Sequence, residues 1–296
     1  MANLPIELVR KVFETATVDH PTYAPKFTLI SRDVREWTEP LMYETVILSS
    51  KMACKGFLRA INRKGPEFIA RHVKVLNIQQ PETPDVQYFP IIKSIVQACI
   101  GVTNLCCWSY DPSSHFTRWL CATDLHPRRL CLRTRDLSSY DGIYGDSYDG
   151  PDMSVPAFYS GLTHLEFGDP WAYMSYAADI ARLPQLTYLA LHFIEPDARS
   201  GMDEQASHFR TILSSESLQV FVLLCRAYQD ENGRKRTFYV EEQIRDPRLL
   251  MMPWVDPPSR WATECWSEGP TMWDRAEAMV QGRSVEAPAI GEMLKV

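Results

Sequence analysis

The sequence predicts an α+β or α/β chain: a small helical unit over residues 1–48, then an irregular solenoid with parallel strands and a C-terminal cap over residues 49–296. Two observations carry this prediction. Apolar residues recur at helical spacing through the first 45 residues. A short strand-like pattern then returns at intervals, with helical stretches between its copies, as in proteins built by stacking strand–helix units.

Composition limits the possible functions. Hydrophobic residues make up 45% of the chain and charged residues 23%, which is ordinary globular usage. The formal net charge of −6 argues against a general nucleic-acid binder, because such proteins usually carry a basic surplus. We find neither a secretory signal nor 18 consecutive apolar residues, so we expect no membrane contact and a cytoplasmic or nuclear location. The eight cysteines form no CxxC pair, and we expect them to be reduced.

The first predicted helix lies near the start of the chain, in NLPIELVRKVFETA. On a helical wheel its apolar side chains fill one arc of about 160°. Pro5 suits the first turn of a helix, where its missing N–H is not needed. The stretch Asp19-His20-Pro21 is expected to end the helix. The members of the apolar arc are Ile6, Leu8, Val9, Val12, Phe13 and Ala16.

A second helical stripe runs from Lys26 to Glu39, with Phe27, Ile30, Val34 and Trp37 at spacings of three, four and three. Pro40 marks either its end or a new start, and PLMYETVIL then drifts into β-branched residues. A unit of this size rarely stabilises itself. Its excess apolar surface must therefore pack on the rest of the chain or on a partner.

Three segments in this region resemble an F-box, in the form common among fungal F-box-like proteins. They are LPIELVRKVFETA, LISRDVREW and the exit PLMYETV, which together cover about one sixth of the chain. The stretch TVDHPTYAPKF departs from the family pattern at the start of the second helix. The resemblance implies docking on the Skp-type adaptor of a cullin ubiquitin ligase, a case of an apolar helical face laid against a partner. It also implies that the contact lies in or near Leu4, Pro5, Leu8, Val12 and Phe13.

The pattern φ-x-x-φ-x-φ, with φ apolar, recurs beyond residue 70. Its middle positions are Leu76, Leu105, Leu130, Leu165, Leu189 and Phe221, separated by 24 to 35 residues. The spacing resembles a degenerate leucine-rich repeat, although no copy carries the asparagine ladder of the strict repeat. An ordinary α/β domain with parallel strands is the alternative. RDPRLLMMPW is expected to add one more buried strand, and TMWDRAEAMVQGRS a short amphipathic helix.

Alternation along the strands assigns their faces. If the repeat leucines point toward the helices, their neighbours line an open, concave face. The apolar trio Val220, Val222 and Leu224 in the last copy predicts that the C-terminal segment or a flanking strand covers that end. Tryptophan, tyrosine and arginine are typical of protein-binding surfaces, so this face is the candidate target site, a solvated face without a ligand being the alternative. The candidates are Asn104, Trp108, Arg129, Arg133, His164, Glu166, Tyr188 and His192.

No motif indicates catalysis. The histidines lack metal-ligand spacing, and the sequence has no GxSxG, Walker or GxGxxG motif, so we expect no cofactor and no metal. The acidic stretch 137–156 lacks the ligand order of a calcium loop and is expected to be a solvent loop or a partner-binding insertion. YQDENGRKRTFYV is expected to form a hairpin around Asn232-Gly233.

The favoured hypothesis is a non-catalytic substrate receptor that joins an adaptor to an unknown target protein. The first alternative is a repeat-type interaction scaffold whose N-terminal helices only cap the solenoid. In that case Ile6, Val9 and Phe13 should pack near residues 46–48 and 73–76. The second alternative is an enzyme with a site on the concave face. It predicts a bound metal or cofactor in the purified protein, unless the enzyme works without one.

Overall fold

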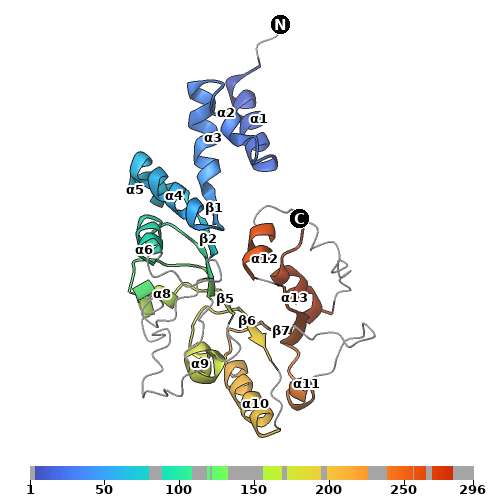
Figure 1. The fold of residues 1–296 in the computed structure, drawn as a ribbon. Coiled ribbons are helices and arrows are strands. Elements are labelled where there is room, and N and C mark those ends of the chain that lie inside the picture. Colours follow the sequence, from blue (N-terminus) through green and yellow to red (C-terminus); the bar gives the residue numbers. More distant parts are fainter. Residues whose placement is uncertain are drawn as a thin grey trace.

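The computed structural model describes residues 4–79, 89–108, 119–120, 122–132, 156–168, 172–194, 199–225, 239–255, 257–264 and 269–282. These residues form an α/β structure around one open, all-parallel sheet of eight strands. The strands lie side by side in chain order, β1 to β8 (Figure 1). Their bounds are β1 Thr45–Leu48, β2 Val75–Gln79, β3 Asn104–Trp108, β4 Arg129–Leu132, β5 His164–Phe167, β6 Tyr188–Phe193, β7 Val220–Cys225 and β8 Leu249–Pro253.

The middle residues of the recurring sequence pattern pair across the sheet. Leu76 lies opposite Leu105, which lies opposite Leu130, and the same register continues through Leu165 and Leu189 to Phe221. All six are at most 1% exposed. The expectation of parallel strands is thus confirmed for these copies. RDPRLLMMPW supplies β8, as expected.

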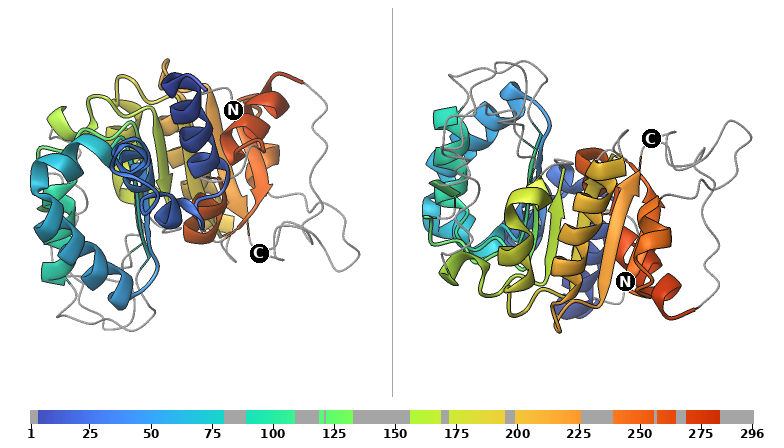
Figure 2. Two further views of the ribbon diagram at one scale, coloured as in Figure 1. Left: turned by 90° about the horizontal axis from the view of Figure 1, so that it is seen from above. Right: turned by 90° about the horizontal axis from the view of Figure 1, so that it is seen from below.

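Most of the helices pack on one face of the sheet and bury the large core (Figures 1 and 2). Figure 2 shows α4 to α6 along one outer side of the strands and α13 on the opposite side of the molecule. Helical stretches were expected between the copies of the repeat, and the segments FPIIKSIVQACI, YMSYAADIARL and EQASHFRTILSS contribute to α6, α9 and α10. The bounds of this layer are α4 Lys51–Lys64, α5 Pro66–His72, α6 Phe89–Ala98, α8 Pro156–Tyr159, α9 Ala172–Ala181, α10 Arg199–Leu213 and α11 Tyr239–Gln243.

Two helices lie on the other face of the sheet, α12 (Pro257–Glu264) and α13 (Met272–Val280). The helix expected in TMWDRAEAMVQGRS is α13, and it begins with a capping box between Thr271 and Asp274. Its Trp273 and Ala276 pack in one cluster with Val220 and Val222. The expectation that the C-terminal segment covers the apolar end of the sheet is therefore confirmed.

The N-terminal helices are α1 (Ile6–Asp19), α2 (Ala24–Phe27) and α3 (Arg32–Glu44), and they project from the first strand of the sheet (Figure 1). The expected helix over 26–39 is divided because Ser31 caps α3, its hydroxyl accepting from the Val34 N–H at 3.1 Å. Pro40 neither ends nor starts a helix, which corrects the sequence-based expectation. The helix continues past it to Glu44, where Tyr43 packs edge-on against Phe68.

Further expectations concern the boundary of the helical unit, the hairpin and the acidic stretch 137–156. The boundary expected at residue 48 assigns β1 to the helical unit, whereas its hydrogen bonds join it to β2. The second arm of the expected hairpin is not a strand at its end, because Tyr239 and Val240 begin α11. The rest of that arm and the stretch 137–155 lie outside the described residues. None of the described helices is long and apolar enough to cross a membrane.

Candidate functional site

Helix α1 has a buried side and an exposed apolar side. On the buried side, Phe13 meets the Phe27 ring edge-on at 5.8 Å between centroids, and the hydroxyl of buried Thr17 donates to the Phe13 carbonyl at 2.7 Å. On the other side, Leu8 and Val12 stand one turn apart and are 53% and 62% exposed. Helix α1 thus holds its place on α2 and α3 without using these two side chains.

The exposed apolar residues of the structure concentrate at this end of the chain. Among the described residues, eight of the twelve exposed large hydrophobic side chains lie between residues 4 and 30. We call these eight the N-terminal apolar set: Leu4, Ile6, Leu8, Val12, Val18, Tyr23, Leu29 and Ile30. Contiguous exposed apolar patches mark interaction surfaces, and within this set Leu8 and Val12 stand one turn apart on the same side of α1.

The residues expected at an adaptor contact divide into two groups. Leu4, Pro5, Leu8 and Val12 are exposed, whereas Phe13 is half-buried in the packing of α1 on α2. Sequence reasoning did not select Leu29 and Ile30 as contact residues, although they are 78% and 58% exposed between α2 and α3. Ile30 belongs to the stripe that was expected to form a helix over residues 26–39, but it lies in the turn between α2 and α3. Helical periodicity groups apolar side chains without saying which of them are covered.

The base of the N-terminal unit is fixed to the sheet by α3 and not by α1. Tyr43 packs between Phe57 of α4 and Phe68 of α5, with centroid distances of 6.5 and 5.3 Å. Lys64 of α4 forms an ion pair with Glu39 of α3. The core cluster that contains Val46, Leu48, Val73 and Leu76 includes no residue of α1.

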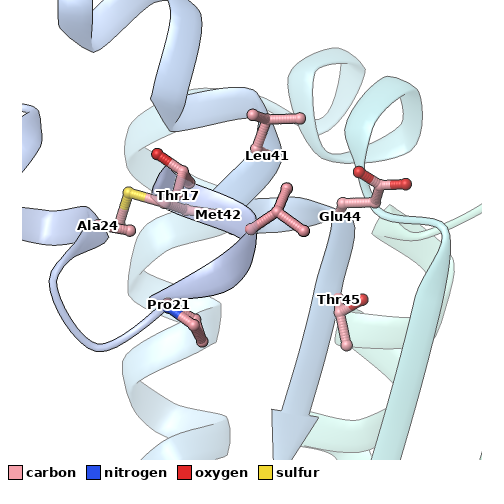
Figure 3. Close-up of a pocket in the computed structure, with 8 residues that line it drawn as sticks. Thr17, Pro21, Ala24, Leu41, Met42, Glu44 and Thr45 are labelled. Atoms are coloured by element: carbon pink, nitrogen blue, oxygen red, sulfur yellow. The ribbon is translucent and has the colours of Figure 1, made fainter. Parts of the chain in front are cut away.

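A pocket of about 390 Å³ separates the end of α1 from the start of the sheet (Figure 3). Its lining is mixed, with apolar Val18 and Leu41, the carboxylate of Glu44 and the hydroxyl of Thr45. The other lining residues are Thr17, Pro21, Ala24 and Met42. Because this space lies between them, α1 does not cover the first strand as a capping helix would.

The face of the sheet that sequence analysis expected to be open is largely covered by α12 and α13. Glu166 lies in its centre, 1% exposed, and forms an ion pair with the buried Arg260 of α12. The Trp261 indole N–H donates to the same carboxylate oxygen at 3.1 Å. Trp261 also packs with Trp108, Cys106 and Cys131. Gly168 leaves room for this arrangement, since a Cβ there would lie 2.0 Å from the Trp108 ring.

Burial shifts the pKa of several groups on this face. It raises the pKa of the Cys131 thiol well above its ordinary value, and the hydrogen bond between this thiol and the neighbouring Cys106 acts in the same direction. It lowers the pKa of His164 to about 4, with Arg129 contributing. The Tyr188 pKa is raised by burial and by the hydrogen bond that its hydroxyl donates to Glu277. Thiols of this kind remain protonated near neutral pH and are poor nucleophiles.

The structure separates the expected target-binding residues by their depth on the sheet. Trp108, Glu166 and His192 are buried under the C-terminal segment. Asn104, Arg129, His164 and Tyr188 stand side by side at the first positions of their strands and are half-buried. His164 stacks on Tyr188 at 4.3 Å between centroids and meets Trp273 of α13 edge-on. Arg133 lies outside the described residues.

Among the described residues, no group of three histidine, cysteine or acidic side chains is placed to hold a metal ion. No protein-family model, no curated protein and no solved structure matches this chain. The assignment of function therefore rests on the N-terminal apolar set, the covered sheet and the resemblance carried by the first 48 residues.

Proposed function

We propose that this protein is a non-catalytic substrate receptor of a cullin-type ubiquitin ligase. Its N-terminal helices would act as an F-box and bind a Skp-type adaptor, and the sheet with its helices would act as an irregular leucine-rich-repeat-like solenoid that binds a target protein. The exposure of Leu8 and Val12 on one side of α1, with Leu4 exposed just before the helix begins, is the observation that carries the proposal.

The energetics of this surface support a partner. Fully covering a leucine or valine side chain contributes about 1.5–3 kcal/mol by the usual transfer scale, so several such residues at one surface supply a substantial part of a binding free energy. The last turn of α3 packs on α4 and α5. A protein bound to α1 would therefore be held at a defined position relative to the sheet.

The scaffold alternative, in which the N-terminal helices only cap the solenoid, receives less support. It requires Ile6, Val9 and Phe13 to pack near the first strands. Ile6 is 56% exposed, Val9 is half-buried, and Phe13 packs on Phe27 of α2. The capping contacts come from α3, through Tyr43.

The test is a calorimetric titration of the full chain with a recombinant Skp-type adaptor. We expect binding, and we expect Leu8→Asp to weaken it by about a hundredfold or more, because a carboxylate would be buried in an apolar contact. Met52→Asp is the matched control, since Met52 is equally apolar and 71% exposed but lies on α4. Absence of binding by the unsubstituted chain, or equal effects of the two substitutions, would contradict the proposal.

A further inference from the structure

The centre of the covered sheet face is chemically unusual. Glu166 stands on the same face as Cys106, Cys131 and Ala190, all at 0–1% exposure. A carboxylate in such a position requires a cation and hydrogen-bond donors, because burial without them is costly. Here both come from two consecutive residues of α12, Arg260 and Trp261, which lie 94 and 95 residues further along the chain.

The two C-terminal helices are held on the sheet by different means. Helix α13 inserts Met272, Trp273 and Ala276 into an apolar cluster. Helix α12 has only eight residues, and the side chains that it places deepest on the strands are the ion-paired Arg260 and the indole of Trp261. The two attachments therefore differ in kind, one being apolar and the other centred on a charge.

The ion pair is only partly satisfied. Glu166 Oε2 accepts from both Arg260 and Trp261, while Glu166 Oε1 and Arg260 Nε have no hydrogen-bond partner among the described residues. Arg260 Nε lies 3.9 Å from Glu264, and its Nη1 contacts the Met272 sulfur at 3.0 Å. A buried pair of this kind contributes little net stability and is better suited to selecting one arrangement over another.

We propose that the surface around Glu166 is a docking site for a protein segment that carries an arginine directly followed by an aromatic residue, and that α12 occupies this site until such a segment displaces it. The partner's arginine would pair with Glu166. Its aromatic ring would take the place of Trp261 against Trp108, Cys106 and Cys131. Helix α13 would stay in place through its apolar contacts. This inference does not depend on adaptor binding and can fail independently of it.

The first test uses a fluorescent peptide with the sequence of residues 254–264, WVDPPSRWATE, as the probe. In the full chain, Arg260→Ala combined with Trp261→Ala empties the site, and this double variant is expected to bind the peptide. The unsubstituted chain should bind it at least about tenfold more weakly, because its own α12 is present at a high effective concentration. Anisotropy titrations measure both affinities.

Two controls make the outcome specific. Adding Glu166→Gln to the double variant, or replacing the arginine of the peptide with alanine, should weaken binding by at least about tenfold, since each removes one partner of a buried charge pair. Failure of the folded double variant to bind the peptide would overturn the proposal. Equal binding with and without Glu166 would overturn it too.

A second measurement needs no substitution and serves if the double variant does not fold. Cys131 lies under α12, whereas Cys54, Cys99 and Cys225 lie in the core on the helix-covered face. If α12 leaves by local opening, a maleimide should label Cys131 at least about tenfold faster than those three, because their exposure requires larger unfolding. Equal labelling rates for all four thiols would show that α12 leaves only on global unfolding, and the proposal would be wrong.

Discussion

Helices α1 and α13, near the two ends of the chain, differ in whether their apolar side chains are covered. At the N-terminus, α1 packs through Phe13 and leaves Leu8 and Val12 in solvent. At the C-terminus, α13 buries Trp273 to 5% exposure against the last strands. The difference indicates that the C-terminal helix is part of the fold, whereas the exposed side of the N-terminal helix is available to another molecule. The substitutions below test this contrast, from the largest expected effect to the smallest.

Trp273→Ala should give the largest loss of stability. Removing a buried tryptophan side chain costs about 3–5 kcal/mol, because apolar contacts are lost and a cavity remains. Urea denaturation measures the change in the free energy of unfolding. Met279→Ala on the same helix is the control and should change it by less than about 0.5 kcal/mol, since Met279 is 39% exposed. Equal effects of the two substitutions would mean that α13 is not anchored through Trp273.

Arg260→Met should destabilise by about 3 kcal/mol, since Glu166 would remain buried without its cation. The value falls at the low end of the usual range because an unpaired carboxyl can take up a proton instead. The double substitution Glu166→Leu with Arg260→Met should restore most of the stability. A double variant no more stable than Arg260→Met alone in urea denaturation would show that the ion pair itself, and not the cost of an unpaired charge, holds α12.

The success of the strand prediction and the failure to foresee the Glu166 contact have the same cause. Alternation along a strand assigns each side chain to a face, and Leu76 to Phe221 fall into register because the strands stack in chain order. Alternation does not say what lies on the other face. The apolar trio Val220, Val222 and Leu224 indicated a cover over that end of the sheet, whereas Glu166 was expected on an open face as a candidate target-binding residue.

The contacts of α12 could not be read from the sequence because they join distant residues. Nothing in the local pattern around residue 260 pointed to a carboxylate 94 positions earlier.

The helices α4 and α5 were also missed between the predicted unit and the first repeat, although the burial of Phe57, Ile61 and Ile69 shows an apolar stripe. A proline inside a helix usually kinks or ends it, but α3 continues past Pro40 because its last turn is held by the packing of Tyr43.

His164→Asn should change how stability depends on pH. Because burial and Arg129 lower the pKa of His164 from 6.5 to about 4, the unfolded state binds more protons between these values. Stability should therefore fall as the pH drops from about 6.5 toward 4, by on the order of 1 kcal/mol after discounting for solvent screening of a partly exposed ring. The variant should show a shallower fall in urea denaturation across this range, and an unchanged slope would contradict the assignment.

Leu8→Asp should have the smallest effect on stability, within about 0.5 kcal/mol, because the side chain is exposed. Phe13→Ala is the comparison on the same helix. It should cost about 1–2 kcal/mol, less than for a fully buried ring, since Phe13 is half-buried against Phe27. Thermal unfolding of the two variants measures the difference. A large loss of stability in Leu8→Asp would mean that this side of α1 already packs within the chain.

Hydrogen exchange of the full chain with and without a Skp-type adaptor tests the central contrast most directly. The account predicts that the adaptor increases amide protection within residues 4–30 and leaves α13 unchanged, because the N-terminal apolar set is exposed whereas Trp273 of α13 is already buried on the sheet. Protection that appeared in α13 or along the sheet while residues 4–30 stayed unchanged would contradict the account. So would an adaptor that left the whole exchange pattern unaltered.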